Sequence, residues 1–322
     1  MLSSVGDGIH VVDSGFVHPG LDAIHLIVER GRVAIVDTGV NDSVPRVLAA
    51  LSELTLAPEA VDWVVLTHVH LDHAGGAGLL MQQLPGARLL VHPRGARHMI
   101  DPSKLAAATA AVYGSEAARR MYGEIVPVPA AQVVSAPDGF GFELNGRVLT
   151  VIDTPGHARH HLSLVDRQAG VVFAGDTFGL SYRALDDSGR QFVVPSTTPV
   201  QFDPPALHAS IDRIAALAPR AVAVTHFGPV GDVPRLAADL HRQIDALVAM
   251  AGDCARRCDP GEARRDPASS ETLRRLLRDG VRELLFDEAR RQGWTFDEAG
   301  LLQIFTLDIG LNADGLFAWL TA

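Results

Sequence analysis

One short stretch of the chain gathers side chains that bind metal ions. Residues 67–76 read Thr-His-Val-His-Leu-Asp-His-Ala-Gly-Gly and follow an apolar run with the character of a buried strand. Three imidazoles and a carboxylate at such a strand end have few partners among themselves, and a divalent cation satisfies several of them at once. If the chain turns tightly, His68 and His70 converge on one point, while Asp72 and His73 converge on a second point nearby. This spacing predicts two neighbouring ions.

Three later residues of ligand type each close a strand-like run. Because strand ends can meet at one edge of a sheet, these side chains are expected to join the same site. They are His157, Asp176 and His226.

The pattern His-x-His-x-Asp-His, followed in order by these three residues, resembles the metallo-β-lactamase superfamily. The resemblance covers roughly residues 8–230 and implies an α/β fold, a four-layer αββα sandwich with metals at one edge. It implies one ion on His68, His70 and His157, a second ion on Asp72, His73 and His226, and Asp176 as a bridge between the two ions.

Asp37 lies in an Asp-Thr-Gly turn that also matches the superfamily. The resemblance suggests that it supports the metal ligands from behind. The alternative is a turn aspartate that caps the helix expected from Ser43.

The predicted chemistry is hydrolysis. The mixed nitrogen and oxygen ligands suit two Zn²⁺ ions, and iron or manganese would also accept them. A water shared by two cations loses its proton near neutral pH, and Asp72 is the candidate catalytic residue that orients it and takes up the proton. Resemblance to glyoxalase II and lactonase members favours a thioester or lactone as the small-molecule substrate. The alternatives are an iron-dependent redox enzyme of the persulfide dioxygenase type, a phosphodiesterase, or a non-catalytic scaffold.

Composition narrows the class of protein. The chain has 322 residues, 47% of them hydrophobic, and a formal net charge of −10, which opposes binding to nucleic acid. Cys254 and Cys258 are too few for a disulfide framework and are expected to be reduced thiols. With no signal sequence or membrane span evident, the sequence favours a cytoplasmic protein that does not bind membranes.

Two helical additions to the sandwich are expected. One is an insertion at about 96–130, and the other is an extension over 234–322 that follows a catalytic domain of residues 1–233. The apolar stripes of the extension must bury against something, either the catalytic core or a second copy in a homodimer.

The residues that line the substrate pocket are the feature that the sequence predicts least well. An insertion acting as a lid would place Tyr113 and Met121 toward the substrate, but for either residue taken singly the sequence favours a place in the core of a helical hairpin. Tyr182, in the polar loop 179–199, is the third candidate. His160 and His161 lie close to His157 but are expected to be dispensable, because the ligand set is complete without them.

Overall fold

The computed structural model describes residues 2–186, 190–197 and 200–322, without the side chains of residues 112 and 113. The chain forms two compact units. The first unit contains residues up to 154, together with 160–175 and 218–231. The second contains 155–159, 176–217 and 232–322. The boundary expected at residue 233, between the catalytic domain and the C-terminal extension, stays a prediction.

The first sheet of the first unit begins as an antiparallel meander and ends in parallel strands. Its strands follow chain order, antiparallel as far as β4 and parallel from β4 to β7. Short β-branched runs at 8–13, 22–28 and 32–37 predict an antiparallel meander, and β2, β3 and β4 confirm it. The strands are β1 (Leu2–Gly6), β2 (Ile9–Asp13), β3 (Ala23–Glu29), β4 (Arg32–Val36), β5 (Val61–Val65), β6 (Arg88–Val91) and β7 (Val133–Ser135).

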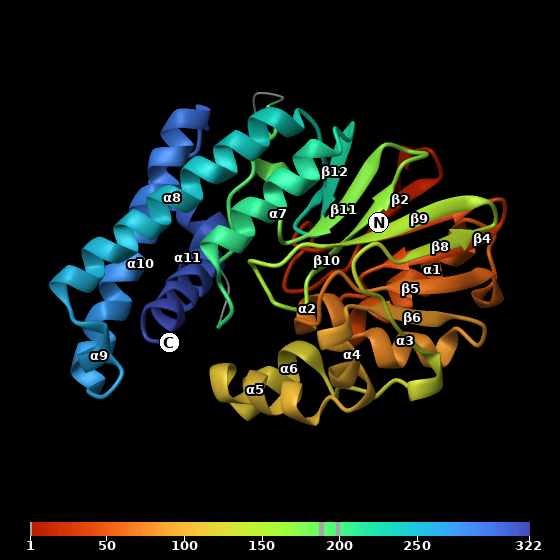
Figure 1. Ribbon diagram of the computed structural model, residues 1–322, viewed down its shortest axis with the longest axis horizontal. Helices are drawn as coiled ribbons and strands as arrows, with labels where there is room; N and C mark the ends of the chain where they lie inside the picture. The colour runs from red at the N-terminus through yellow and green to blue at the C-terminus, as the bar shows by residue number, and fades with distance from the viewer. Residues whose placement is uncertain (1, 187–189, 198–199) are drawn as a thin grey trace. The chain divides into compact units, whose positions relative to one another are not determined.

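The second sheet lies over the first (Figure 1), in the order β13-β12-β11-β10-β9-β8. Only the β11–β12 pair is parallel among the described strands of this sheet. Its strands are β8 (Gly141–Leu144), β9 (Arg147–Asp153), β10 (Leu162–Asp166), β11 (Val171–Gly175), β12 (Ala221–Val224) and β13 (Gly228–Val230).

The two sheets share one hydrophobic core, in which Ile27 and Val65 of the first sheet meet Leu164 and Phe173 of the second. The opposite face of the first sheet is covered by helices α1 (Val44–Glu53), α3 (Ala77–Gln83) and α4 (Pro93–Ile100). Helix α1 buries Val44, Val47 and Leu51, whose spacing places them on one helical face. Short 3₁₀ helices lie at Asn41–Ser43, Pro58–Ala60 and Ala130–Gln132.

The helical insertion has the form expected from the sequence. Helix α5 (Ser103–Tyr113) and helix α6 (Ser115–Tyr122) are separated by Gly114, whose φ of 81° suits glycine. Within the insertion Tyr122 is buried and Met121 is half-buried, whereas the Tyr113 side chain lies outside the described part of the chain.

The second unit is helical, with α7 (Pro204–Ala216), α8 (Val233–Arg257), α9 (Pro260–Ala263), α10 (Pro267–Gln292) and α11 (Glu298–Leu320), and a 3₁₀ helix at Arg183–Leu185. Both cysteines are free thiols, as expected. Two details that the sequence predicts for the extension, a polar linker over 259–270 and a last helix over 300–311, were wrong. The linker stretch contains α9 and the start of α10, and the last helix runs from Glu298 to Leu320.

Helix α11 is long and apolar enough to cross a membrane by length and composition alone, although half of its apolar window is buried inside the protein. Two of its polar side chains accept hydrogen bonds from the segment that precedes α7. Asp308 accepts a hydrogen bond of 2.9 Å from the Tyr182 hydroxyl, and Asn312 accepts one of 2.6 Å from the backbone amide of Thr197. This is the pattern of a helix within a protein core.

The buried histidine His25 of β3 is expected to make the fold sensitive to acid. Burial lowers the pKa of His25 to about 4, so below its ordinary value of 6.5 the unfolded chain takes up a proton that the native chain does not. The native state therefore loses stability as the pH falls from 6.5 towards 4, by roughly 3 kcal/mol in total.

We predict that His25→Leu flattens this part of the pH profile of the free energy of unfolding, measured by denaturant titration between pH 4.5 and 8. A variant with the same pH slope as the wild type would contradict the assignment.

Candidate metal centre

The ligand-rich stretch leaves the first sheet at the end of β5 and turns at once into helix α2 (Leu71–Ala74). The backbone amide of Thr38 donates a 2.7 Å hydrogen bond to the His73 carbonyl, which fixes the turn. A side chain at Gly76 would meet the Val40 carbonyl oxygen at 2.6 Å, so only glycine allows this close approach. The local sequence thus positions His73 rigidly inside the first unit.

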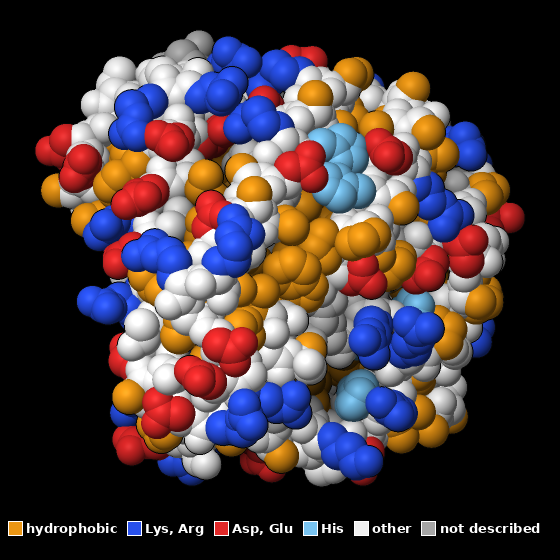
Figure 2. Space-filling view, turned by 60° about the vertical axis from the view of Figure 1, so that its left-hand side comes forward, with side chains coloured by type: hydrophobic (Ala, Val, Ile, Leu, Met, Phe, Trp, Pro, Cys, Tyr) orange, Lys and Arg blue, Asp and Glu red, His pale blue; other side chains and the backbone are white. Residues whose placement is uncertain are grey.

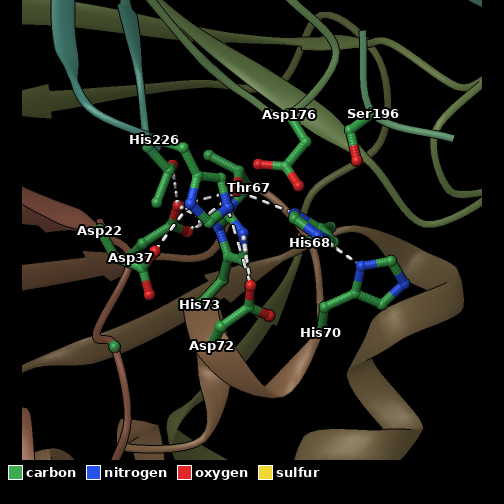
Figure 3. A network of polar contacts seen from close by, with 12 residues as sticks. Asp22, Asp37, Thr67, His68, His70, Asp72, His73, Asp176, Ser196 and His226 are labelled. Atoms are coloured by element: carbon green, nitrogen blue, oxygen red, sulfur yellow. Dashed lines mark hydrogen bonds and ion pairs between the residues drawn. The ribbon is translucent and has the colours of Figure 1, made fainter. Parts of the chain in front are cut away.

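Three predicted ligands of the first unit point toward one another (Figure 3). A carboxylate oxygen of Asp72 lies 3.6 Å from Nε2 of His73 and 3.7 Å from Nε2 of His226. These distances exceed ordinary hydrogen bonds. Ligand atoms held about 2.0–2.2 Å from one ion would stand at such separations from each other, so the three side chains fit a divalent metal.

The other ring nitrogen of each histidine binds a buried carboxylate. Nδ1 of His73 lies 2.9 Å from Asp37, and Nδ1 of His226 lies 2.7 Å from Asp22. Burial raises the pKa of Asp22, and the neighbouring His226 opposes that rise. A histidine that binds a metal usually donates its second N–H to a carboxylate, which fixes the tautomer and the ring orientation. Both imidazoles are therefore prepared for binding a metal through Nε2.

Asp37 holds the ligand loop by hydrogen bonds and does not cap helix α1, which decides between the two roles that the sequence left open for it. It accepts hydrogen bonds from the backbone amide of Thr67 at 2.8 Å and from the Thr225 hydroxyl at 2.9 Å, besides its contact with His73. Helix α1 begins at Val44 without using the Asp37 side chain as its cap. Sequence reasoning missed Asp22, Thr67 and Thr225 because single aspartates and threonines in turns carry no spacing signal.

His68 and His70 form a second group in the first unit. Nε2 of His68 lies 2.9 Å from Nδ1 of His70, and Nδ1 of His68 lies 3.2 Å from the Thr67 hydroxyl. His161 stacks on His68 with ring centroids 5.0 Å apart, and its Nδ1 lies 2.9 Å from the Thr154 hydroxyl. His160 is also close, 5.6 Å from the His70 ring. The rings of His160 and His161 thus pack against the predicted ligands His70 and His68.

The remaining two predicted ligands meet within the second unit. Nε2 of His157 lies 3.4 Å from a carboxylate oxygen of Asp176, and its Nδ1 lies 3.4 Å from the Ser196 carbonyl. A bend at Gly156, with φ 128°, brings the chain against Leu207 of α7, where a Cβ would approach the Leu207 backbone to 2.3 Å. This pair has the same arrangement as the first unit's histidines, with one nitrogen held by an oxygen atom and the other facing a carboxylate.

The pocket candidates lie in different surroundings. Tyr182 is buried against α11 through its bond to Asp308, so a role for it in substrate binding stays a prediction. A cavity of about 570 Å³ lies under the insertion, and Tyr122 lines it while Met121 does not. The cavity reaches Leu71, between the predicted ligands His70 and Asp72. It offers the first unit an open volume beside the ligand loop.

Comparison with known proteins assigns the family. A model of the Metallo-beta-lactamase superfamily matches residues 20–226. The chain belongs to the metallo-β-lactamase superfamily. A metallo-beta-lactamase fold-containing protein of Sulfurisphaera tokodaii is 28% identical over 69% of this chain and 79% of its own length. A hydroxyacylglutathione hydrolase of Aeromonas hydrophila is 31% identical over 60% of this chain, and the match spans only 56% of that relative.

Solved structures agree with this assignment. A metallo-beta-lactamase family protein of Thermus thermophilus superposes with a TM-score of 0.62, covering 94% of this chain and 95% of its own, at 24% identity. The archaeal protein of Sulfolobus tokodaii gives a TM-score of 0.61 at 26% identity, covering 74% and 86% of the two chains. The predicted superfamily sandwich with C-terminal helices is confirmed.

The carboxylate behind His73 gives a test of the centre. We predict that Asp37→Asn weakens metal binding about 10-fold to 100-fold, because the amide keeps the shape but replaces one acceptor oxygen with a donor. Asparagine tolerates the positive φ of 60° found at Asp37, so the backbone is not the cause. Affinity is measured by competition with a chromogenic chelator. Asp42→Asn, at an exposed carboxylate nearby, is the control and should bind as the wild type does.

Proposed function

We propose that this protein is a metal-dependent hydrolase that cleaves an ester-like bond, a thioester or a lactone, on two divalent ions. The observation that carries the proposal is the set of paired imidazoles in the first unit, each with one ring nitrogen bound by a carboxylate and the other directed at a shared point. Superfamily membership and the hydroxyacylglutathione hydrolases among the relatives support the reaction class.

The proposed centre uses all seven predicted ligands. His68, His70 and His157 would hold one ion, Asp72, His73 and His226 would hold the other, and Asp176 would contribute its carboxylate to both. The ligand-type geometry within each unit supports this assignment. Neutral imidazoles with carboxylates favour Zn²⁺.

When bound, the ions would supply Lewis-acid chemistry and would make an attacking water acidic enough to lose its proton near neutral pH. Asp72 would orient the attacking water through its carboxylate and accept the released proton. It is suited to this because its side chain is 24% exposed, in contrast to the fully enclosed His73, so solvent reaches it. Asp22 and Asp37 keep the imidazoles in the correct tautomer throughout the reaction.

The cavity under the insertion supports an acyl substrate. Its walls include the small side chains of Ala106, Ala110 and Ala118, with Arg119 also in the lining. Small apolar walls fit an acyl chain or an aliphatic lactone, and an arginine suits an anionic leaving portion.

The first test probes the substrate class. We predict turnover on a panel of thioesters and lactones, and a loss of about tenfold in kcat/KM for the longest acyl chains in Ala110→Phe, which fills the cavity. The matched control is Ala108→Phe, on the exposed side of the same helix, which should keep the wild-type chain-length profile. No turnover of any ester-like compound, or oxygen consumption by an iron-loaded protein, would overturn the proposal.

The second test probes the ligand set. We predict that His68→Ala and Asp176→Ala each lose bound metal and at least 100-fold in kcat, since each removes a ligand of the proposed centre. Metal content is measured by mass spectrometry and folding by circular dichroism. His18→Ala, at an exposed histidine outside the site, is the control. Full metal content with full turnover in either ligand variant would refute the assignment.

A further inference from the structure

A second histidine pair lies in the second unit, on helices α7 and α8, away from every predicted ligand in sequence. The imidazole rings of His208 of α7 and His241 of α8 are nearly coplanar, with ring centroids 4.8 Å apart and an interplanar angle of 15°. Their Nδ1 atoms face each other at 2.5 Å. Both side chains are 28% exposed, so the pair is accessible from solvent.

Each imidazole also contacts a carboxylate of the opposite helix. Nε2 of His241 lies 2.9 Å from Asp212 of α7, and Nε2 of His208 lies 3.2 Å from Asp245 of α8. Each aspartate follows the histidine of its own helix by four residues, so it shares that helix face. The two helices therefore present the same His-x-x-x-Asp pattern to one another. Figure 2 shows histidine side chains at the surface with acidic side chains on either side of them.

When both imidazoles are neutral and donate from Nε2, their Nδ1 atoms repel each other, and a cation between them would remove that repulsion. A neutral imidazole carries one N–H, and the ionised carboxylates of Asp212 and Asp245 accept it from Nε2 in both rings. The Nδ1 atoms of His208 and His241 then meet lone pair to lone pair at 2.5 Å, which is repulsive. A positive charge between them removes the repulsion, and the carboxylates behind the rings strengthen both nitrogens as ligands.

We propose that His208 and His241 form a separate, surface-exposed binding site for a divalent transition-metal ion, with Asp212 and Asp245 as the supporting carboxylates. Imidazole nitrogens suit Zn²⁺, Ni²⁺ and Cu²⁺. Relaxation of the rings by less than an ångström opens the space for an ion with bonds of about 2.0–2.1 Å. Water completes the coordination, since the carboxylates are largely exposed at 74% and 77%. The bound ion cross-links α7 to α8.

The test counts ions in the whole protein. Wild type, His208→Ala and His241→Ala are dialysed to equilibrium against buffers of defined free Zn²⁺, and bound zinc is counted by mass spectrometry. We expect the wild type to bind one more equivalent than either variant. Asp212→Asn should weaken that equivalent about tenfold, because it removes the support of one ring. His18→Ala keeps the number of histidines equal to that of the variants and should bind as the wild type does.

Two further readouts separate this site from the proposed hydrolase centre. Turnover should be the same in wild type and His241→Ala, and zinc should raise the melting temperature of the wild type more than that of His241→Ala. Equal zinc content in wild type and both histidine variants at every free concentration would overturn the proposal. That outcome is also expected if a single proton bridges the two rings, so it would replace the metal site with a shared proton.

Discussion

The first unit depends on the buried carboxylate of Asp37. Only 1% of this residue is exposed, and a charge so enclosed is stable only when several donors surround it. Its donors come from the end of β5 through Thr67, from α2 through His73, and from the end of β12 through Thr225. One side chain thus joins the edges of both sheets at the point where the predicted ligands emerge. The packing of the two sheets and the orientation of His73 therefore both depend on the hydrogen bonds of Asp37.

The separation of residues along the chain explains which parts of the site could be predicted from the sequence. His68, His70, Asp72 and His73 are close in sequence, so their spacing alone predicts that their side chains gather. Asp37 became a candidate supporting residue only through its Asp-Thr-Gly turn, beside the alternative of a helix cap. Asp22 was missed, because its supporting role depends on a contact with His226, 204 residues away. Long-range partners of this kind carry no periodicity that a single sequence can reveal.

The helices and strands also divide into those that a local sequence pattern predicts and those that it does not. Strands β2 to β6 and the hairpin of the insertion were predictable because β-branched runs and alanine-rich runs are bounded by glycines such as Gly114, whereas β1 and β7 were not predicted. Helix α11 was predicted too short because it is apolar on nearly all sides, so no stripe marks where its buried face ends. The hydrogen bonds that Asp308 and Asn312 accept from Tyr182 and Thr197 are tertiary contacts, which no local pattern shows.

Burial distinguishes the predicted ligand His73 from the exposed pair His208 and His241. His73 is fully enclosed and its supporting carboxylate is nearly so, which means that its orientation is set before any ion arrives. The exposed pair His208 and His241 uses the same chemistry, but its aspartates stand largely in water, where a carboxylate holds an imidazole weakly. A preorganised ligand loses less freedom on binding than an exposed one. The enclosed group is therefore suited to hold an ion through many reaction cycles, whereas the exposed pair is suited to exchange its ion with the surrounding solution.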